Sequence, residues 1–200
     1  MKIRQSGMPA EEYWESLFDV PLILSRLEIA RYGDVAELGC GYGTFTVPAA
    51  RATRGTLYAF DVDSDMVDRT RERTAGLRVI CQQRDVMESG FGRQVDAVML
   101  FNILHVERPV DLLRHAATAA PTVLVVHWRY GATPRGPSLD IRPRPEQIAD
   151  WAEEAGLVAD PVIELPPWHF GLQLSRHATS RECSGNASRR AAHVDDRRDN

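Results

Sequence analysis

Short apolar runs alternate with amphipathic segments along most of the chain. The runs with strand character occupy residues 35–38, 55–61, 77–81, 95–104, 122–128, 162–165 and 168–174. Apolar positions at helical spacing predict helices over residues 64–74, 109–120 and 146–155, preceded by two helices that begin near Pro9 and Pro21. Strands that alternate with helices at this spacing need crossover connections, which favour a parallel sheet and an α/β fold.

The most informative stretch is residues 35–50, VAELGCGYGTFTVPAA. A short apolar strand leads into three glycines at alternate positions, and a helix is expected to begin near Thr44. Gly39, Gly41 and Gly43 permit positive φ angles and allow a ligand to approach the backbone closely. Free N–H groups at the helix start suit an anionic group such as a carboxylate or a phosphate. The stretch therefore predicts a ligand-binding loop.

The spacing of the glycines argues against two common ligands. A phosphate-binding P-loop needs a lysine after its last glycine, but the single lysine of this chain is Lys2. The dinucleotide fingerprint GxGxxG would need its third glycine at Thr44. What remains is an acid, Glu37, two residues before the first glycine. A carboxylate at that position can accept hydrogen bonds from the ammonium group of a ligand.

Acids also follow the second and third predicted strands, where open parallel sheets bind their ligands. Asp61 can accept hydrogen bonds from both ribose hydroxyls of a nucleoside, although an acid there can also cap the next helix. The carboxylate of Asp85 can accept from an exocyclic amine while the N–H of Val86 donates to a ring nitrogen, which together recognise adenine. A turn residue is the alternative for Asp85.

Four segments together resemble the successive motifs of class I S-adenosylmethionine-dependent methyltransferases, of the small, single-domain type 11/12 kind. They are ELGCGYG at 37–43, AFDVDSDMV at 59–67, RDV at 84–86 and VDAVMLFNILHVERP at 95–109. The resemblance covers roughly residues 30–175. It departs from the family pattern before the fifth strand, where Ala120-Pro121-Thr122 replaces the usual Gly-Gly turn.

The resemblance implies a Rossmann-like, seven-stranded, mostly parallel sheet in the order 3-2-1-4-5-7-6, with helices on both faces and the last strand antiparallel. It also implies S-adenosyl-L-methionine as the cofactor. Glu37 and the three glycines are expected at the methionine end of this cofactor. The complete set of predicted cofactor contacts is Glu37, Gly39, Gly41, Gly43, Asp61, Val62, Asp85, Val86 and Asn102.

Side chains after the fourth and fifth strands are candidates for the acceptor pocket. Asn102, His105, His127 and Trp128 can converge beside the transferable methyl, where proximity supplies much of the rate. A histidine can deprotonate an acceptor hydroxyl or amine, so His105 and His127 are the predicted catalytic residues. The alternative for each imidazole is a structural role that ties a loop to its strand. Trp128 is equally compatible with a place in the core.

Two further segments are candidates for the wall of this pocket. The loop 129–145 is rich in proline, glycine and arginine, and its arginines can clamp an acidic substrate or remain solvated. Those arginines are Arg135, Arg142 and Arg144. Near the N-terminus, Tyr13, Trp14 and Phe18 recur at helical spacing. Packing on the core is favoured for this aromatic stripe over a role as a substrate lid.

The composition of the chain limits the number of domains, the kinds of partner and the location that can be expected. The 200 residues, 44% of them hydrophobic and 26% charged, predict one domain over residues 1–175 and a disordered tail over 176–200. A net charge of −4 offers no general attraction to nucleic acid or to an anionic membrane. Three cysteines without CxxC spacing indicate neither a disulfide framework nor a zinc site. With no apolar signal segment, a cytoplasmic location is expected.

The sequence therefore predicts a cytoplasmic, S-adenosylmethionine-dependent methyltransferase that acts on a small-molecule acceptor, with no metal, nucleic acid or membrane partner. The main alternative is a non-catalytic S-adenosylmethionine-binding partner or regulatory subunit. Arsenite methylation is disfavoured because it needs several thiolates near the methyl, whereas Cys40 lies in the glycine loop and Cys183 in the tail. The glycine spacing disfavours a Rossmann dehydrogenase.

Overall fold

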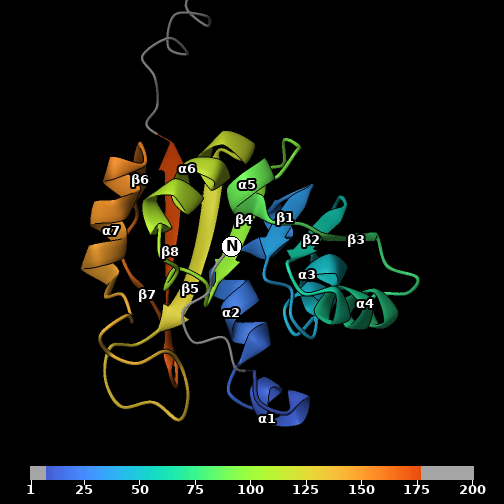
Figure 1. Ribbon diagram of the computed structural model, residues 1–200, viewed down its shortest axis with the longest axis horizontal. Coiled ribbons are helices and arrows are strands. Elements are labelled where there is room, and N and C mark those ends of the chain that lie inside the picture. The colour runs from blue at the N-terminus through green and yellow to red at the C-terminus, as the bar shows by residue number, and fades with distance from the viewer. Residues whose placement is uncertain (1–7, 177–200) are drawn as a thin grey trace, which may run out of the picture.

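An eight-stranded sheet forms the centre of the structure, a computed structural model that describes residues 8–176 (Figure 1). The strands follow the order β3-β2-β1-β4-β5-β8-β6, and β7 pairs with β8. The first five strands are parallel: β1 (Val35–Leu38), β2 (Leu57–Asp61), β3 (Val79–Gln83), β4 (Ala97–Phe101) and β5 (Thr122–Trp128). The predicted tail beyond residue 176 lies outside the described residues.

The predicted strand order is confirmed, with one strand added. The long strand β8 (His169–Arg176) runs antiparallel between β5 and β6 (Leu157–Ala159), as the resemblance implies for the last strand of the sheet. The extra strand β7 (Ile163–Leu165) forms a hairpin with the start of β8. The apolar pattern missed β6, because this strand has only three residues and its central Val158 is exposed.

Helices cover both faces of the sheet. On one face lie α5 (Val86–Ser89), α6 (Pro109–Ala119) and α7 (Pro145–Glu154). On the other lie α2 (Val20–Arg26), the 3-10 turn η1 (Ile29–Arg31) and α3 (Thr46–Ala52), while α4 (Ser64–Arg73) packs beside α3 on β2 and β3. The short helix α1 (Glu11–Glu15) lies at the end of the molecule where the loop between β5 and α7 also lies (Figure 1). No helix within residues 8–176 is long and apolar enough to cross a bilayer.

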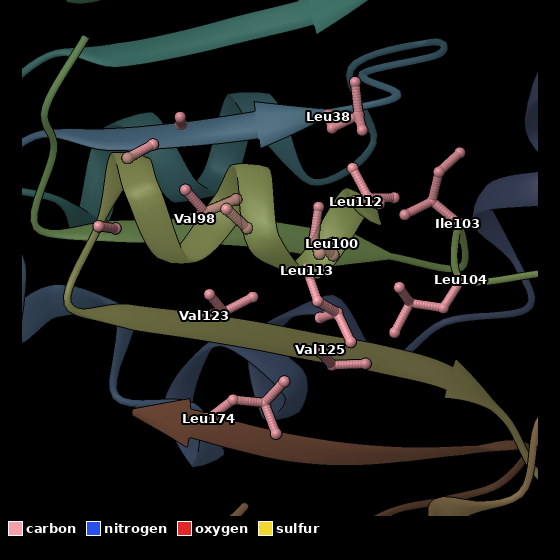
Figure 2. Close-up of a cluster of buried hydrophobic side chains, with 14 of the residues drawn as sticks. Leu38, Val98, Leu100, Ile103, Leu104, Leu112, Leu113, Val123, Val125 and Leu174 are labelled. Atoms are coloured by element: carbon pink, nitrogen blue, oxygen red, sulfur yellow. The ribbon is translucent and has the colours of Figure 1, made fainter. Parts of the chain in front are cut away.

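Alternation along the central strands supplies a core on each face. In Figure 2, Val98 and Leu100 of β4 point toward Leu112 and Leu113 of α6. The intervening residues of β4 belong to the second core, on the face covered by α2 and α3. A strand buried on both faces needs apolar residues at every position, which is why the central strands appear in the sequence as continuous apolar runs.

Among the element boundaries that differ from the prediction, two shape the site. The helix after the glycine loop begins at Thr46 instead of near Thr44, because Gly43 has a φ of 79° and the chain completes a turn before Phe45 caps the helix. Strand β4 ends at Phe101, because Asn102 takes a φ of 56° and turns the chain. Ile103 and Leu104 remain apolar and buried without being strand residues.

Candidate functional site

A cleft of about 830 Å³ lies at the carboxyl ends of β1, β2, β4 and β5. Open parallel sheets bind their ligands in this position. The wall comes from the N-terminal segment, the glycine loop, the end of β2, the segment after β4, and the end of β5 with the loop that follows it. Its residues are Met8, Trp14, Gly39, Cys40, Gly41, Tyr42, Thr44, Phe45, Asp61, Val62, Asp63, Met66, Phe101, Asn102, Ile103, His105, Trp128, Arg135, Gly136 and Pro137.

Asp61 lines this cleft at the end of β2 and also supports the glycine loop. Its Oδ2 accepts a hydrogen bond from the N–H of Gly41 at 3.0 Å, and its Oδ1 accepts from the N–H of Asp63 at 3.1 Å. Burial raises the pKa of Asp61, while the hydrogen bonds from the two amides act in the opposite direction. Each carboxylate oxygen has a further lone pair, so the group can still accept from a pair of hydroxyls.

The glycine loop is held from outside by α4. The hydroxyl of Thr70 donates to the carbonyl of Gly41 at 2.8 Å. Gly39 and Gly41 have φ angles of 77° and 52°, which side-chain-bearing residues rarely adopt, and both line the cleft. Gly43 does not line the cleft, because it packs against Thr70. The loop therefore presents backbone to the cleft at two of its three glycines.

Glu37 lies beneath the loop and is only 2% exposed. The hydroxyl of Thr46 donates to its Oε2 at 2.6 Å. Burial raises the pKa of Glu37 to about 8, the Thr46 hydrogen bond opposes this shift, and the nearby Asp61 adds to it. Glu37 is not among the residues that line the cleft. Its contact with a ligand ammonium group stays a prediction.

The two residues predicted to recognise adenine lie at the start of α5. The side chain of Asp85 accepts from the N–H of Met87 at 2.9 Å and thereby caps the helix. Val86 is fully buried, and as the first helical residue its N–H has no acceptor within α5. Neither residue lines the cleft, whereas Val62, also a predicted contact, does. The adenine contacts stay a prediction.

Asn102 lines the cleft from the turn after β4. Its backbone N–H donates to the carbonyl of Val126 at 2.7 Å, which fixes the turn to β5. The side-chain Oδ1 and Nδ2 are both buried, and neither has a hydrogen-bond partner among residues 8–176. Buried amide groups without partners cost free energy, so a ligand that supplies hydrogen bonds here removes that cost.

The two predicted catalytic histidines lie next to each other but differ in access. Their ring centroids are 5.7 Å apart, with the rings edge to face. His105 lines the cleft and also a smaller cavity of about 430 Å³ that reaches toward α6 and α7. His127 is fully buried behind it, near Phe170, and does not line the cleft. Of the two, only His105 lines the cleft.

Both imidazoles are neutral at physiological pH. Burial lowers the pKa of His105 to about 4, and the positive charge of Arg142 contributes to this shift. Burial lowers the pKa of His127 well below its ordinary value, and the neighbouring His105 adds to the effect. Nδ1 of His105 is buried without a hydrogen-bond partner in the described part of the chain. A neutral imidazole can accept a hydrogen bond from an acceptor hydroxyl.

Arg142 organises the loop between β5 and α7, an arrangement that no sequence pattern indicated. The side chain is 7% exposed. Its Nε and Nη2 donate to the carbonyl of Pro137 at 2.9 and 2.6 Å, and its Nη1 donates to the carbonyls of Arg129 and Gly131 at 3.0 and 2.9 Å. Arg142 therefore holds the loop and does not face a substrate. Among the loop arginines, Arg135 lines the cleft.

The N-terminal aromatic residues pack on the core and form part of the cleft wall. Trp14 packs edge-on against Phe18 at 4.8 Å and Trp128 at 6.3 Å, and it also lines the cleft. Trp14 therefore packs on the core as expected, and a role as a substrate lid stays a prediction. Tyr13 is 46% exposed and is not among the lining residues.

Ion pairs with α4 attach the N-terminal segment to the domain. Arg69 donates to Glu11 at 3.0 Å, and Arg73 donates to Glu15 at 2.7 Å and to the carbonyl of Tyr42 at 2.8 Å. The hydroxyl of Tyr42 in turn donates to the carbonyl of Pro9 at 3.0 Å. Sequence reasoning missed these contacts, although two acids on one side of a short helix were a signal for them.

A cleft above the strand ends, with a glycine loop on one side and an acid at the end of β2, is the arrangement that the resemblance to class I methyltransferases implies. Residues 35–123 match the family model described as a methyltransferase domain. This match covers less than half of the chain and agrees with the predicted resemblance to class I S-adenosylmethionine-dependent methyltransferases. A search of curated proteins finds no match to this chain.

Solved structures share the fold at low sequence identity. A SAM-dependent methyltransferase from Aquifex aeolicus is 22% identical, with a TM-score of 0.70 over 82% of this chain and 92% of that one. Magnesium protoporphyrin IX methyltransferase from Synechocystis PCC 6803, with bound S-adenosylhomocysteine (SAH), is 15% identical, with a TM-score of 0.64 over 86% and 90% of the two chains.

An O-methyltransferase from neocarzinostatin biosynthesis, in complex with SAH and 1,4-dihydroxy-2-naphthoic acid, is 18% identical with a TM-score of 0.67. The match covers 77% of this chain, which spans 52% of the length of that protein. The prediction of S-adenosylmethionine as the cofactor of the family is confirmed.

Proposed function

We propose that this protein uses S-adenosylmethionine to methylate a small-molecule acceptor. The observation that carries the proposal is one cleft that combines the Asp61-supported glycine loop with His105 and an aromatic wall. The N-terminal segment and the loop after β5 both contribute to the wall of the cleft. The cleft volume of about 830 Å³ has room for a small molecule. The naphthoic acid in the complex of the neocarzinostatin enzyme is an acceptor-sized ligand on the same fold.

The residues of the cleft fit the cofactor. The carboxylate of Asp61 is available to two ribose hydroxyls, Gly39 and Gly41 offer backbone without side chains, and Asn102 offers an unpaired amide. When bound, the cofactor would supply a methyl group: an acceptor oxygen or nitrogen would form a bond to the methyl carbon as the bond from that carbon to the sulfonium sulfur breaks and SAH leaves. Glu37, Gly43, Val62, Asp85 and Val86 are the remaining proposed contacts.

The chain itself contributes positioning, water exclusion and a proton acceptor. Trp14 and residues 135–137 line the cleft and restrict the access of water to it. The neutral imidazole of His105 can take the proton of an acceptor hydroxyl as the acceptor reacts. His127 lies directly behind His105 and holds its ring in place. In this proposal His105 is the catalytic residue and His127 a positioning residue.

Calorimetric titration of the purified protein with SAH and with NAD tests the first half of the proposal. Binding of SAH without binding of NAD is expected. Binding of NAD alone would contradict it. Acceptor profiling with S-adenosylmethionine tests the second half. A protein that binds SAH but turns over no acceptor would instead be the non-catalytic binding partner considered as the alternative.

A further inference from the structure

The two ends of the cleft differ in chemistry. At the end formed by β2, the wall carries Asp61 and Asp63, which are the only carboxylates among the described residues that line the cleft. At the end formed by β4 and β5, it carries Phe101 and Trp128. Because β1 and β4 separate β2 from β5, the two ends are about 14 Å apart, three strand spacings. The polar end suits a nucleoside, which leaves the aromatic end for the acceptor.

The aromatic end is built from rings that pack against one another. Trp14 and Trp128 are 6.3 Å apart at 63°, and Phe45 and Phe101 are 5.1 Å apart at 83°. These four rings come from four separate segments of the chain, and all four line the cleft. Rings in edge-to-face contact restrain one another, so the wall is preformed.

The loop after β5 closes this end with backbone instead of side chains. A Cβ added at Gly136 would lie 2.8 Å from Cγ of Trp128 and 2.9 Å from Nη2 of Arg142. The backbone of Gly136 therefore lies directly against the indole, with Pro137 next to it in the wall. A wall made of indole rings and flat backbone is complementary to a flat ligand.

Charge distinguishes between the acceptor classes. None of the described residues that line the aromatic end of the cleft carries a carboxylate, and the guanidinium of Arg142 lies close enough to His105 to lower its pKa. A cationic acceptor would find no counter-charge there. A hydroxyl would find the neutral imidazole of His105 and the unpaired amide of Asn102. The arrangement therefore favours an uncharged hydroxyl compound over an amine.

We propose that the acceptor is an uncharged, planar aromatic compound whose ring lies against Trp14 and the backbone of residues 136–137, with its hydroxyl hydrogen-bonded to His105. This inference rests on the proposed function, because the bound compound is a methyl acceptor only if the protein is a methyltransferase. The binding site itself is defined by residues of this chain, so it can be tested without turnover.

The experiment is a calorimetric titration of the full-length protein in the presence of SAH with three probes of similar size. They are 1-naphthol, its saturated counterpart 1-decalol, and the 1-naphthylmethylammonium cation. 1-Naphthol is expected to bind about tenfold more tightly than either of the others. Trp14→Leu should weaken 1-naphthol binding about tenfold, whereas Tyr13→Leu, a neighbouring aromatic outside the cleft wall, should leave it unchanged.

A second comparison tests the hydroxyl. The protein should bind 1-methoxynaphthalene about fivefold more weakly than 1-naphthol, the usual cost of one lost hydrogen bond, and His105→Leu should remove this difference. Equal binding of 1-naphthol and 1-decalol by the unmodified protein would overturn the inference even if the variants do not fold. If the unmodified protein binds SAH but binds 1-naphthol and 1-decalol equally, the inference fails and the proposed function stands. If 1-naphthol binds in a Trp14-dependent way and SAH does not, the proposed function fails and the aromatic site remains.

Discussion

The N–H of Gly41 donates to Oδ2 of Asp61 at 3.0 Å, which joins the glycine loop to the end of β2. The same carboxylate lines the cleft, so one side chain shapes the loop and faces the ligand. Asp61→Ala should weaken SAH binding by about 1.5 to 3 kcal/mol, because hydrogen bonds to a charged group are lost. Calorimetry measures this change.

Asp63 provides the matched control for Asp61. Its side chain accepts from the N–H of Asp65 at 2.9 Å and caps α4. Asp63→Ala should therefore destabilise the protein by about 1 kcal/mol, the usual cost of a lost helix cap, with little change in SAH affinity. Chemical denaturation and calorimetry separate the two effects. Equal losses of affinity in the two variants would show that Asp61 is not the principal ribose contact.

The raised pKa of Glu37 predicts that its contribution to the stability of the folded protein falls as the pH rises. The pKa of its buried carboxyl is about 8 in the folded protein, against an ordinary value of 4.5. Between these two pH values the folded state retains a proton that the unfolded state has released, so this group's contribution to stability falls as the pH rises from 4.5 to 8. Glu37→Gln keeps an acceptor for Thr46 but removes the titration.

Denaturant unfolding of the ligand-free protein at pH 5 and pH 8 tests this effect. The difference in free energy of unfolding between Glu37→Gln and the unmodified protein should shift in favour of the variant from pH 5 to pH 8. The same variant should bind SAH more weakly if Glu37 accepts from the ammonium group. A stability difference that does not change with pH would mean that the carboxyl titrates normally.

The different access of His105 and His127 leads to different expected phenotypes. His105→Ala should lower single-turnover methyl transfer about a hundredfold with SAH affinity nearly unchanged, as expected for loss of a proton acceptor. His127→Ala should lower the melting temperature as well, because it opens a cavity behind His105. Full activity of His105→Ala would remove this residue from the mechanism.

Removing the charge of Arg142 should be visible at His105. Burial and Arg142 together hold the pKa of His105 at about 4, so Arg142→Gln should raise that pKa toward its ordinary value of 6.5. It should also release the loop, and trypsin should then cleave faster after Arg135. An NMR titration of His105 and limited proteolysis measure the two effects.

Arg144→Gln is the control for Arg142→Gln, because Arg144 is exposed and its guanidinium lies 3.8 Å from the ring centre of Tyr130. It should change neither the His105 titration nor the rate of cleavage. An unchanged His105 pKa in Arg142→Gln would show that burial alone sets it.

Most of the parallel half of the fold was predictable because its central strands are buried on both faces. Strands such as β4 and β5 therefore appear as unbroken apolar runs, and the acid at the end of β2 follows directly from the strand boundary. The short elements β6 and α5 were missed because three or four residues show no period. The late start of α3 depends on the backbone angle of Gly43, which apolar patterning does not report.

In the site, the different surroundings of His127 and Trp128 follow from the sequence. His127 and Trp128 are adjacent in β5, so their side chains point to opposite faces of the sheet. Val125 shares the face of His127 and packs under α6, whereas Trp128 belongs to the other core. Of the two, Trp128 lines the cleft and His127 does not. The role of Arg142 could not have been predicted in this way, because its partners, apart from the hydroxyl of Thr133, are backbone carbonyls.

The contacts of Arg142 with backbone carbonyls determine how far the sequence of the loop between β5 and α7 can change. Arg142 binds the backbone of Arg129, Gly131 and Pro137, and every amino acid carries a carbonyl oxygen. The shape of the loop is thus largely independent of the side chains at most of its positions. Residues such as Arg135 can be exchanged without dismantling the frame that presents them. Under the proposed function, the loop is therefore a natural position at which to redesign acceptor preference while leaving the glycine loop and Asp61 intact.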